Sequence, residues 1–469
     1  MLNTKKILLV ITGLLSIGAA GQQNPVSSDK TNPSKPNFII IFADDMGYGD
    51  IGVYGHPTIK TPNLDRMAYK GQKWTNFYVA APACTPSRAG LMTGRLPVRT
   101  GMSSGKRRVL FPDSKGGLPD KEITIASALK EAGYSTACIG KWHLGHLPQF
   151  LPSAHGFDYY YGIPYSNDMD RNRIGGRDDL EIILNPKIDY FNVPLMRNSE
   201  IIERPADQTT ITKRYTQEAI KFINQNKNKP FFLYLANSKP HVPLFRSNDF
   251  VDKSLRGVYG DVIQEIDWSV GEILSALKRN NLDDNTLVVF TSDNGPWLFN
   301  EHGGSAGLLR GGKGGTYEGG MREPAILWWP GKLKPGVVMD MSTTMDLLPT
   351  FCSLANVTLP NDRIYDGYDI STSMFGKGPN PRDIVYYYRG TDVFAIREGA
   401  YKAHFVTQPE FGSKEKTFHN PPLLYNLNVD PSEKYNIAKK HPKVINEIKQ
   451  VLKEHLKTVV PVENQLEKL

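Results

Sequence analysis

Cysteine is scarce in this sequence of 469 residues, which contains only Cys84, Cys138 and Cys352. An odd number of cysteines leaves at least one thiol unpaired, so a framework of disulfides does not hold the chain together. Cys138 and Cys352 have apolar neighbours in the sequence, which favours buried core thiols at both positions. Cys84 differs from these two cysteines and requires its own explanation.

Long hydrophobic runs are also missing. The apolar run from Ile7 to Ala20 has 14 residues, too few to cross a hydrocarbon core of about 30 Å, and no other run reaches about 18 residues. It follows Lys5 and Lys6 and ends in small residues, which is typical of a secretory signal peptide, here residues 1–20. No cysteine lies near the cleavage region, which excludes a bacterial lipid anchor. The sequence predicts a periplasmic or secreted protein without stable membrane insertion.

The sequence has no excess of acidic residues and no internal repeat. Charged residues make up 22% of the chain, the net charge is +8, and the 42 glycines and 33 prolines show no collagen-like period. This composition excludes a disordered or fibrous protein. A basic surface favours anionic partners such as nucleic acid, anionic lipid or a sulfated or phosphorylated glycan. The positive charge is dispersed and no nucleic-acid module is recognisable, so we do not expect nucleic-acid binding.

Apolar strands alternate with amphipathic helices over most of the chain. The pattern predicts strands at 37–42, 135–139, 230–236 and 286–291, and helices at 124–132, 214–224 and 259–278. This alternation is typical of an α/β fold with a mostly parallel sheet and helices on both faces. Such sheets bind ligands outside the carboxyl ends of their strands.

The pattern changes near residue 360. Short strands at 384–388, 393–397, 401–406 and 423–426 precede a helix at 443–458, which predicts a smaller antiparallel sheet with one helix. We therefore predict a polar tether at 21–36, a larger N-terminal domain at 37–362 and a C-terminal subdomain at 363–469.

Polar residues follow two of the predicted strands. Asp44 and Asp45 come directly after the first strand, and Asp293 and Asn294 follow the strand at 286–291. An Asp pair after one strand would on its own indicate a turn or a helix N-cap. Two such clusters at strand ends favour a metal site, because Ca²⁺ prefers carboxylate and amide oxygens. Mg²⁺ and Mn²⁺ take the same ligands, so the residue types leave the ion open.

Cys84 begins the segment Cys-Thr-Pro-Ser-Arg. Pro86 is well placed for the first turn of a helix, which would put Cys84 at the positive helix end. With Arg88 one turn further on, we expect a lowered thiol pKa. A thiolate nucleophile and an inert buried cysteine are both compatible with this pattern.

These residues resemble a known family. The segments 84–88 and 91–95 (Leu-Met-Thr-Gly-Arg) resemble the signature of the type I, formylglycine-dependent sulfatases, in particular the branch of arylsulfatase A and N-acetylgalactosamine-6-sulfatase. The similarity extends over residues 36–440, with matching motifs at 42–50, 61–65, 140–145, 292–295 and 312–324. It implies an alkaline-phosphatase-like α/β fold with a small C-terminal subdomain, and one calcium ion per chain.

The resemblance also implies a role for each matching residue. The metal ligands would be Asp44, Asp45, Asp293, Asn294 and Cys84, the last oxidised to 3-oxoalanine (formylglycine) by a maturation enzyme. The catalytic residues would be Cys84, Arg88, Lys141, His143, His241 and Lys313. Substrate would also contact Ser166, Lys313 and His241.

The implied roles agree with the chemistry of sulfate esters. Arg88 would hold the formylglycine hydrate, and Lys141 and His143 would contact the hydrate and the sulfate. Lys313 would bind a sulfate oxygen, and His241 would lie near the leaving oxygen. Cations and a proton donor stabilise the charge that develops on these oxygens. A lone histidine after a strand is more often structural, but the prolines on both sides of His241 and its matching position favour the site.

The segment 169–198 departs from the animal enzymes of the family. It contains Arg171, Arg173, Arg177 and Arg197. A charge-rich loop is usually a solvated face, and our hypothesis is that this one contacts the sugar of the substrate.

The sequence therefore predicts an exported, calcium-dependent sulfatase acting on carbohydrate, such as ulvan, carrageenan or a glycosaminoglycan. One alternative is a phosphatase, phosphodiesterase or phosphonate hydrolase of the same superfamily. Cys84 argues against this alternative, because the phosphatases of the superfamily usually have Ser or Thr as the nucleophile. The other is a catalytically silent glycan-binding protein in which Cys84 is never oxidised.

Overall fold

The computed structural model describes residues 35–172, 179–298, 300–410 and 415–469. The predicted signal peptide and almost all of the predicted tether lie outside the described residues. No helix in the described part of the chain is long and apolar enough to span a membrane.

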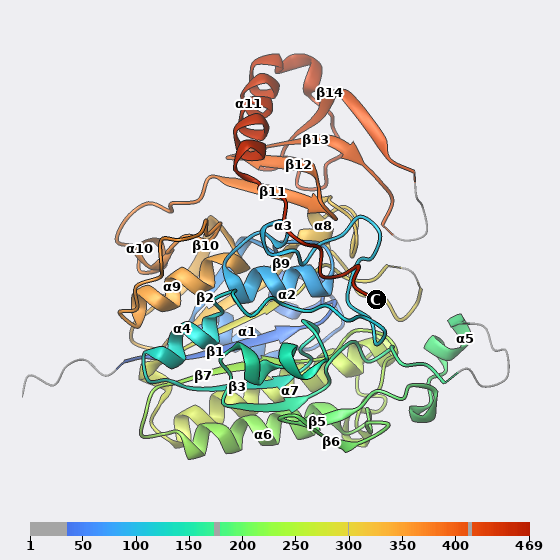
Figure 1. Cartoon of the computed structure of the whole chain (residues 1–469), viewed down its shortest axis with the longest axis vertical. Coiled ribbons are helices and arrows are strands. Elements are labelled where there is room, and N and C mark those ends of the chain that lie inside the picture. The colour runs from blue at the N-terminus through green and yellow to red at the C-terminus, as the bar shows by residue number, and fades with distance from the viewer. Residues whose placement is uncertain (1–34, 173–178, 299, 411–414) are drawn as a thin grey trace, which may run out of the picture. The chain divides into compact units, whose positions relative to one another are not determined.

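Two sheets organise the described residues (Figure 1). The larger has ten strands in the order β10-β2-β9-β8-β1-β7-β3-β4-β5-β6, and the smaller has four in the order β11-β12-β13-β14. The strands of the larger sheet are β1 Asn37–Ala43, β2 Gln72–Tyr78, β3 Ser135–Gly140, β4 Tyr159–Gly162, β5 Leu195–Arg197, β6 Glu200–Glu203, β7 Phe231–Ala236, β8 Thr286–Ser292, β9 Arg322–Trp328 and β10 Gly336–Thr343. Those of the smaller sheet are β11 Ile384–Arg389, β12 Asp392–Glu398, β13 Tyr401–Thr407 and β14 Thr417–Asn426.

Helices connect the strands. The α-helices are α1 Pro62–Lys70, α2 Cys84–Thr93, α3 Pro97–Thr100, α4 Ile125–Glu131, α5 Asp179–Leu184, α6 Ile211–Gln225, α7 Gly257–Arg279, α8 Glu318–Met321, α9 Leu347–Leu354, α10 Ser371–Met374 and α11 Pro442–Thr458. The short 3₁₀ helices are η1 Gly52–Tyr54, η2 Pro148–Phe150, η3 Pro152–His155, η4 Ile188–Tyr190, η5 Asn248–Phe250, η6 Asp283–Asn285, η7 Thr344–Asp346 and η8 Ala438–Lys440.

The centre of the larger sheet is parallel, as the sequence predicts. β1 pairs in parallel with β7 and β8, and β3 pairs in parallel with β7 and β4. β9 is antiparallel to its two neighbours, and β5 and β6 extend the opposite edge as antiparallel strands. The prediction of an α/β fold with a mostly parallel sheet is confirmed.

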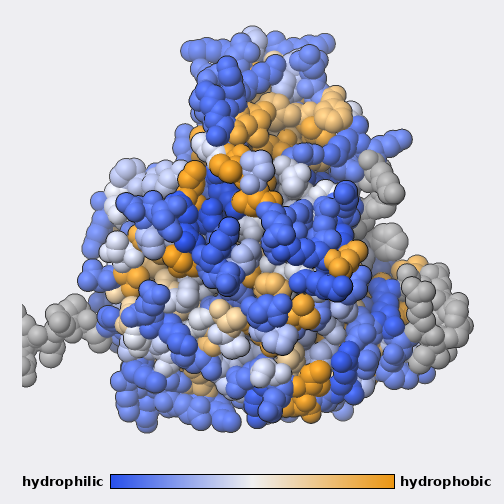
Figure 2. Space-filling model, in the orientation of Figure 1, coloured by the Kyte–Doolittle hydropathy of each residue, from blue (hydrophilic) through white to orange (hydrophobic). Residues whose placement is uncertain are grey.

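The central strands are buried on both faces. In β1, Phe38, Ile40 and Phe42 pack with side chains of α2, α4 and α9, whereas Ile39 and Ile41 pack with side chains of α1, α6 and α7. Successive side chains of a strand point to opposite faces, so a continuous apolar run fits a strand covered by helices on both sides. Figure 2 shows that hydrophilic side chains cover most of the face turned to the viewer.

Parallel pairing aligns the carboxyl ends of four strands at one edge of the sheet. In the register, Ala43 at the end of β1 lies opposite Ser292 of β8, and Gly140 at the end of β3 lies opposite Ala236 of β7. Gly140 has a φ of +118°, and a Cβ there would lie 1.8 Å from the carbonyl oxygen of Ala236. Only glycine fits this position, which directs the chain from β3 into Lys141.

The C-terminal sheet is antiparallel throughout, and α11 packs against it, which confirms the predicted small subdomain. The exact boundary stays a prediction. Ile370 and Met374, beyond the predicted boundary at residue 362, belong to the same apolar cluster as Phe38 of β1, and so does Leu466 near the C-terminus.

A buried network of charges joins the two sheets. The ammonium of Lys402 on β13 lies 2.9 Å from Glu318 of α8 and 3.0 Å from Glu433, and all three side chains are fully buried. Glu433 also accepts a hydrogen bond of 2.7 Å from the backbone N–H of Glu318. Removal of the Lys402 ammonium would leave two carboxylates buried without this cation, which is costly in free energy.

We expect Lys402→Met to lower the free energy of unfolding by about 3–5 kcal/mol, because it removes the buried ammonium that contacts both the Glu318 and the Glu433 carboxylate. The measurement is the denaturant midpoint. Lys457→Met is the matched control, because Lys457 pairs with Glu454 at an exposed position of α11 and should change little. Equal midpoints for the two variants would contradict the structural role of the network.

Candidate functional site

Four oxygen-bearing side chains meet at the carboxyl ends of β1 and β8. Asp44, Asp45, Asp293 and Asn294 are buried, none being more than 2% exposed. The backbone N–H of Asp45 donates to Asp293 at 3.1 Å, and the Asn294 amide donates to Asp45 at 2.8 Å. The expected convergence of the two clusters is therefore present. Asp45 holds a left-handed backbone with φ 68°, a conformation that costs free energy for a residue other than glycine.

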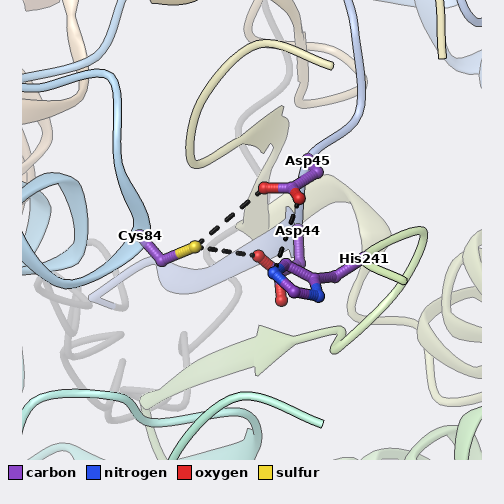
Figure 3. Close-up of side chains that lie close together, drawn as sticks. All are labelled: Asp44, Asp45, Cys84 and His241. Carbon is purple, nitrogen blue, oxygen red and sulfur yellow. Dashed lines mark hydrogen bonds and ion pairs between the residues drawn. The ribbon is translucent and has the colours of Figure 1, made fainter. Parts of the chain in front are cut away.

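Cys84 faces these carboxylates from the first turn of α2 (Figure 3). Its Sγ lies 3.5 Å from Asp44 and 4.0 Å from Asp45, and the ammonium of Lys313 lies 3.4 Å from the sulfur. Ala83 precedes the helix in an extended conformation. The predicted place of Cys84 at the positive end of a helix is confirmed.

The expectation of a lowered thiol pKa is wrong. Burial raises the pKa of Cys84 well above its ordinary value, and the charge of Asp293 raises it further, while Lys141 and Lys313 oppose the rise. Arg88, which we expected to favour the thiolate, instead donates to Asp293 at 2.8 and 3.0 Å. A free thiolate at Cys84 is thus disfavoured.

Three buried cations compensate the three carboxylates. Arg88 pairs with Asp293 and lies 3.5 Å from Asp44, Lys141 lies 2.6 Å from Asp44, and Lys313 lies 2.7 Å from Asp45. Burial alone would raise the pKa of Asp44, but the charges of Lys141, His241 and Arg88 hold it well below its ordinary value. Burial and the neighbouring charge of Asp44 raise the pKa of Asp293 to about 7.

Two histidines border the cluster. His143 has φ 59° and its Nε2 donates to the Leu110 carbonyl at 2.9 Å, while its Nδ1 is buried without a hydrogen-bond partner among the described residues. Burial and the charge of Lys141 hold the pKa of His143 well below its ordinary value. His143 is therefore a neutral imidazole whose Nδ1 can accept a hydrogen bond.

His241 lies beside Asp45 and Ser166. Its Nδ1 is 2.6 Å from the Val242 carbonyl and its Nε2 is 3.6 Å from Asp45 and 3.4 Å from the Ser166 hydroxyl. Because a carbonyl only accepts, Nδ1 carries the proton and Nε2 faces the site. Burial and the charge of Lys313 lower the pKa of His241. Ser166 also contacts Lys141 at 3.1 Å, so all the predicted site residues gather around one centre.

The donor set fits a metal ion. Asp44, Asp45, Cys84 and His241 each place a ligand atom within 4.8 Å of the others. The Oδ1 atom of Asn294 is buried and has no hydrogen-bond partner within the described ranges, and an orphaned amide oxygen beside carboxylates is a suitable ligand for such an ion. His241 enters this group, although the sequence placed it with the substrate. In the described part of the chain, this is the one group of three or more metal-ligand side chains found.

Sequence reasoning missed two aromatic residues of the site. The Tyr234 hydroxyl of β7 accepts a hydrogen bond from Arg88 at 3.3 Å, and nothing in the apolar run of β7 distinguishes it. Trp297 lies edge-on to His241, with ring centroids 5.9 Å apart, and 5.8 Å from the ammonium of Lys313. Its position shortly after Asn294 could have identified it.

Two of the four arginines of segment 169–198 lie within the described residues. Arg197 on β5 pairs with Glu218 of α6 at 2.8 Å, and Arg171 donates to the Asp168 carbonyl at 3.0 Å. Arg173 and Arg177 lie outside the described residues. The hypothesis that this segment contacts a sugar stays a prediction.

Comparison with known proteins agrees with this geometry. The sulfatase family model matches residues 36–357, and the model of the C-terminal region of aryl-sulfatase matches residues 380–469. Human arylsulfatase A is 43% identical over 454 residues, covering 89% of this chain and 87% of that protein. N-acetylgalactosamine-6-sulfatase of the dog is 39% identical over 500 residues, covering 98% of this chain and 91% of that protein.

A solved structure shares the fold. Ps i-CgsB in complex with k-i-k-neocarrahexaose superposes with a TM-score of 0.77 at 30% identity, covering 93% of this chain and 95% of that chain. The resemblance to the branch of arylsulfatase A and N-acetylgalactosamine-6-sulfatase is confirmed, as is the alkaline-phosphatase-like fold. The chain belongs to the sulfatase family and is an enzyme that hydrolyses sulfate esters.

Proposed function

We propose that the protein is an exported, calcium-dependent sulfatase that removes sulfate from carbohydrate, with a formylglycine nucleophile derived from Cys84. The observation that carries this proposal is the position of Cys84 at the start of α2, with its sulfur in contact with Asp44, Asp45 and Lys313. The high pKa of the buried thiol argues against an unmodified thiolate. The similarity to a structure solved with a carrageenan-type hexasaccharide supports a carbohydrate substrate, in the class of sulfated algal polysaccharides or glycosaminoglycans.

The chain's own residues supply the remaining chemistry. Asp44, Asp45, Asp293 and Asn294, with the modified Cys84, would hold the ion, which when bound supplies Lewis-acid polarisation of the nucleophile and the ester oxygens. Lys141 and Lys313 lie within 2.7 Å of the carboxylates. Their ammonium groups are placed to turn to sulfate oxygens, while Arg88 and His143 position the hydrate.

His241 and Ser166 lie where the leaving oxygen would be. Nε2 of His241 faces the site and is 3.4 Å from the Ser166 hydroxyl. An anionic sulfate ester beside the imidazole would raise its pKa again. His241 would then protonate the leaving oxygen as a general acid.

Cys84→Ala and Cys84→Ser should each lower sulfate release by about 10³-fold or more, because the nucleophile is lost. The assay is sulfate release from sulfated sugars and from 4-nitrophenyl sulfate. Cys352→Ala, which removes a buried thiol of the apolar core, is the matched control and should retain activity. Sulfate release by Cys84→Ala at the wild-type rate would refute the proposed nucleophile.

Mass spectrometry tests the modification itself. In protein from its native host, the peptide containing Cys84 should be lighter by about 18 Da, the difference between a thiol and an aldehyde side chain. An unmodified thiol in that protein, together with no release of sulfate, would instead favour a silent glycan-binding protein.

Chelation tests the ion. Treatment with EGTA should abolish sulfate release, and Ca²⁺ should restore it better than Mg²⁺ or Mn²⁺, because a buried set of carboxylate and amide oxygens suits the larger ion. Asn294→Ala should weaken calcium binding by at least about 10-fold, measured as metal content after dialysis. Asn428→Ala, at an exposed turn after β14, should retain calcium. Full restoration by Mg²⁺ alone would contradict the choice of calcium.

A further inference from the structure

A basic cavity of about 560 Å³ lies between the region of α2 and α3 and the C-terminal strands. Its volume is in the usual range for a small-molecule site. Four cationic side chains and a single carboxylate contribute to its lining, namely Lys106, Arg108, Arg389, Lys416 and Asp392. The carboxylate is occupied, because Lys416 pairs with Asp392 at 2.7 Å. Lys106 lies 3.3 Å from Glu467, outside the lining. Cationic side chains outnumber the carboxylate in the lining itself.

Two residues of the cavity lining are sequence neighbours of catalytic residues. Ala83 and Gly314 line it, and they directly adjoin Cys84 and Lys313 in the chain. The two segments lie side by side, since the N–H of Gly314 donates to the Pro82 carbonyl at 2.7 Å. Arg108 also lies two residues before Leu110, whose carbonyl accepts a hydrogen bond from His143. The basic cavity therefore lies beside the two segments that carry Cys84 and Lys313.

The guanidinium of Arg389 is held in place without a carboxylate bound to it. It donates to the carbonyls of Gln408, Pro409 and Glu410 at 2.8 to 3.0 Å, so its hydrogen-bond acceptors there are neutral. Burial and the nearby charge of Arg108 together lower the pKa of Arg389 to about 10, while Glu410 opposes the fall. Burial also lowers the pKa of Arg108. Two partly desolvated positive charges thus lie near each other at one cavity.

We propose that Arg108 and Arg389 bind a second anionic group of the substrate, a sulfate or a carboxylate, on a sugar next to the one whose sulfate ester is hydrolysed. This inference rests on the proposed function and narrows its substrate class to glycans with more than one negative charge. Planar guanidinium groups match both anions, because each can accept paired hydrogen bonds. Such an anion also relieves the repulsion between the two arginines.

The test compares Arg108→Gln and Arg389→Gln with the wild type on substrates with and without a second anion. For a carrageenan tetrasaccharide with several sulfates, KM should rise about 10-fold or more in each variant with little change in kcat, because uniform binding is lost. For 4-nitrophenyl sulfate, which has no second anion, kcat/KM should stay within about 3-fold. A chondroitin sulfate disaccharide, with its uronate, separates recognition of a carboxylate from that of a sulfate.

Arg107→Gln is the matched control, because it removes one positive charge beside Arg108 from a side chain that pairs with Asp113 at 2.6 Å. It should leave both KM values unchanged. Since Arg389 supports three backbone carbonyls, its variant is compared by thermal unfolding, and Arg108→Gln gives an independent answer. Unchanged KM for the tetrasaccharide in Arg108→Gln, or equal losses on both kinds of substrate, would overturn the proposal.

A measurement of binding alone tests the cavity independently of the proposed reaction. The Kd of the same tetrasaccharide is measured by calorimetry for Cys84→Ala alone and combined with Arg108→Gln. The second substitution should weaken binding about 10-fold. If the wild type releases no sulfate, the proposed function fails, but a Kd that depends on Arg108 still supports the cavity. A Kd independent of Arg108 refutes it.

Discussion

Three carboxylates enclosed in one buried volume are the constraint around which the site is built. Like charges at such distances repel strongly when water is excluded, and the raised pKa of Asp293 records this repulsion. Arg88, Lys141 and Lys313 offset it through direct ion pairs. In the described structure these six charges cancel. Addition of a divalent cation would make the centre positive, which suits a sulfate ester and an anionic nucleophile.

The sheet supplies the geometry that this charge arrangement requires. Parallel β1, β3, β7 and β8 end at one edge, so short segments after each strand can converge without long loops. The left-handed backbone at Asp45 and His143 turns two side chains into the centre. Such conformations persist only where the surrounding packing enforces them, and here the fully buried strands on both sides do so.

The pattern of apolar residues and the polar residues at strand ends made the parallel sheet and the place of the site predictable from the sequence. The apolar runs of β1, β7 and β8 are long enough to identify buried strands, and parallel pairing explains why Asp44 and Asp293 meet. Quantities that depend on burial were not predictable. The pKa of Cys84 was misjudged because helix position favours a thiolate, whereas desolvation outweighs it and Arg88 is bound to Asp293. Lys402 gave no signal, because its partners Glu318 and Glu433 are distant in the sequence.

Chemistry and recognition are placed in different parts of the described chain. The carboxylates, their cations and Cys84 come from the larger sheet and its connections, whereas Arg389 of the basic cavity comes from β11 of the smaller one. The segment 313–318 joins the two, because Lys313 contacts Asp45 and Glu318 contacts Lys402 of β13. The C-terminal sheet therefore fixes one wall of the catalytic centre through a buried charge network. The guanidinium of Arg389 donates to the carbonyls of residues 408–410 and not to the catalytic carboxylates, which fits a role in recognition and not in the reaction.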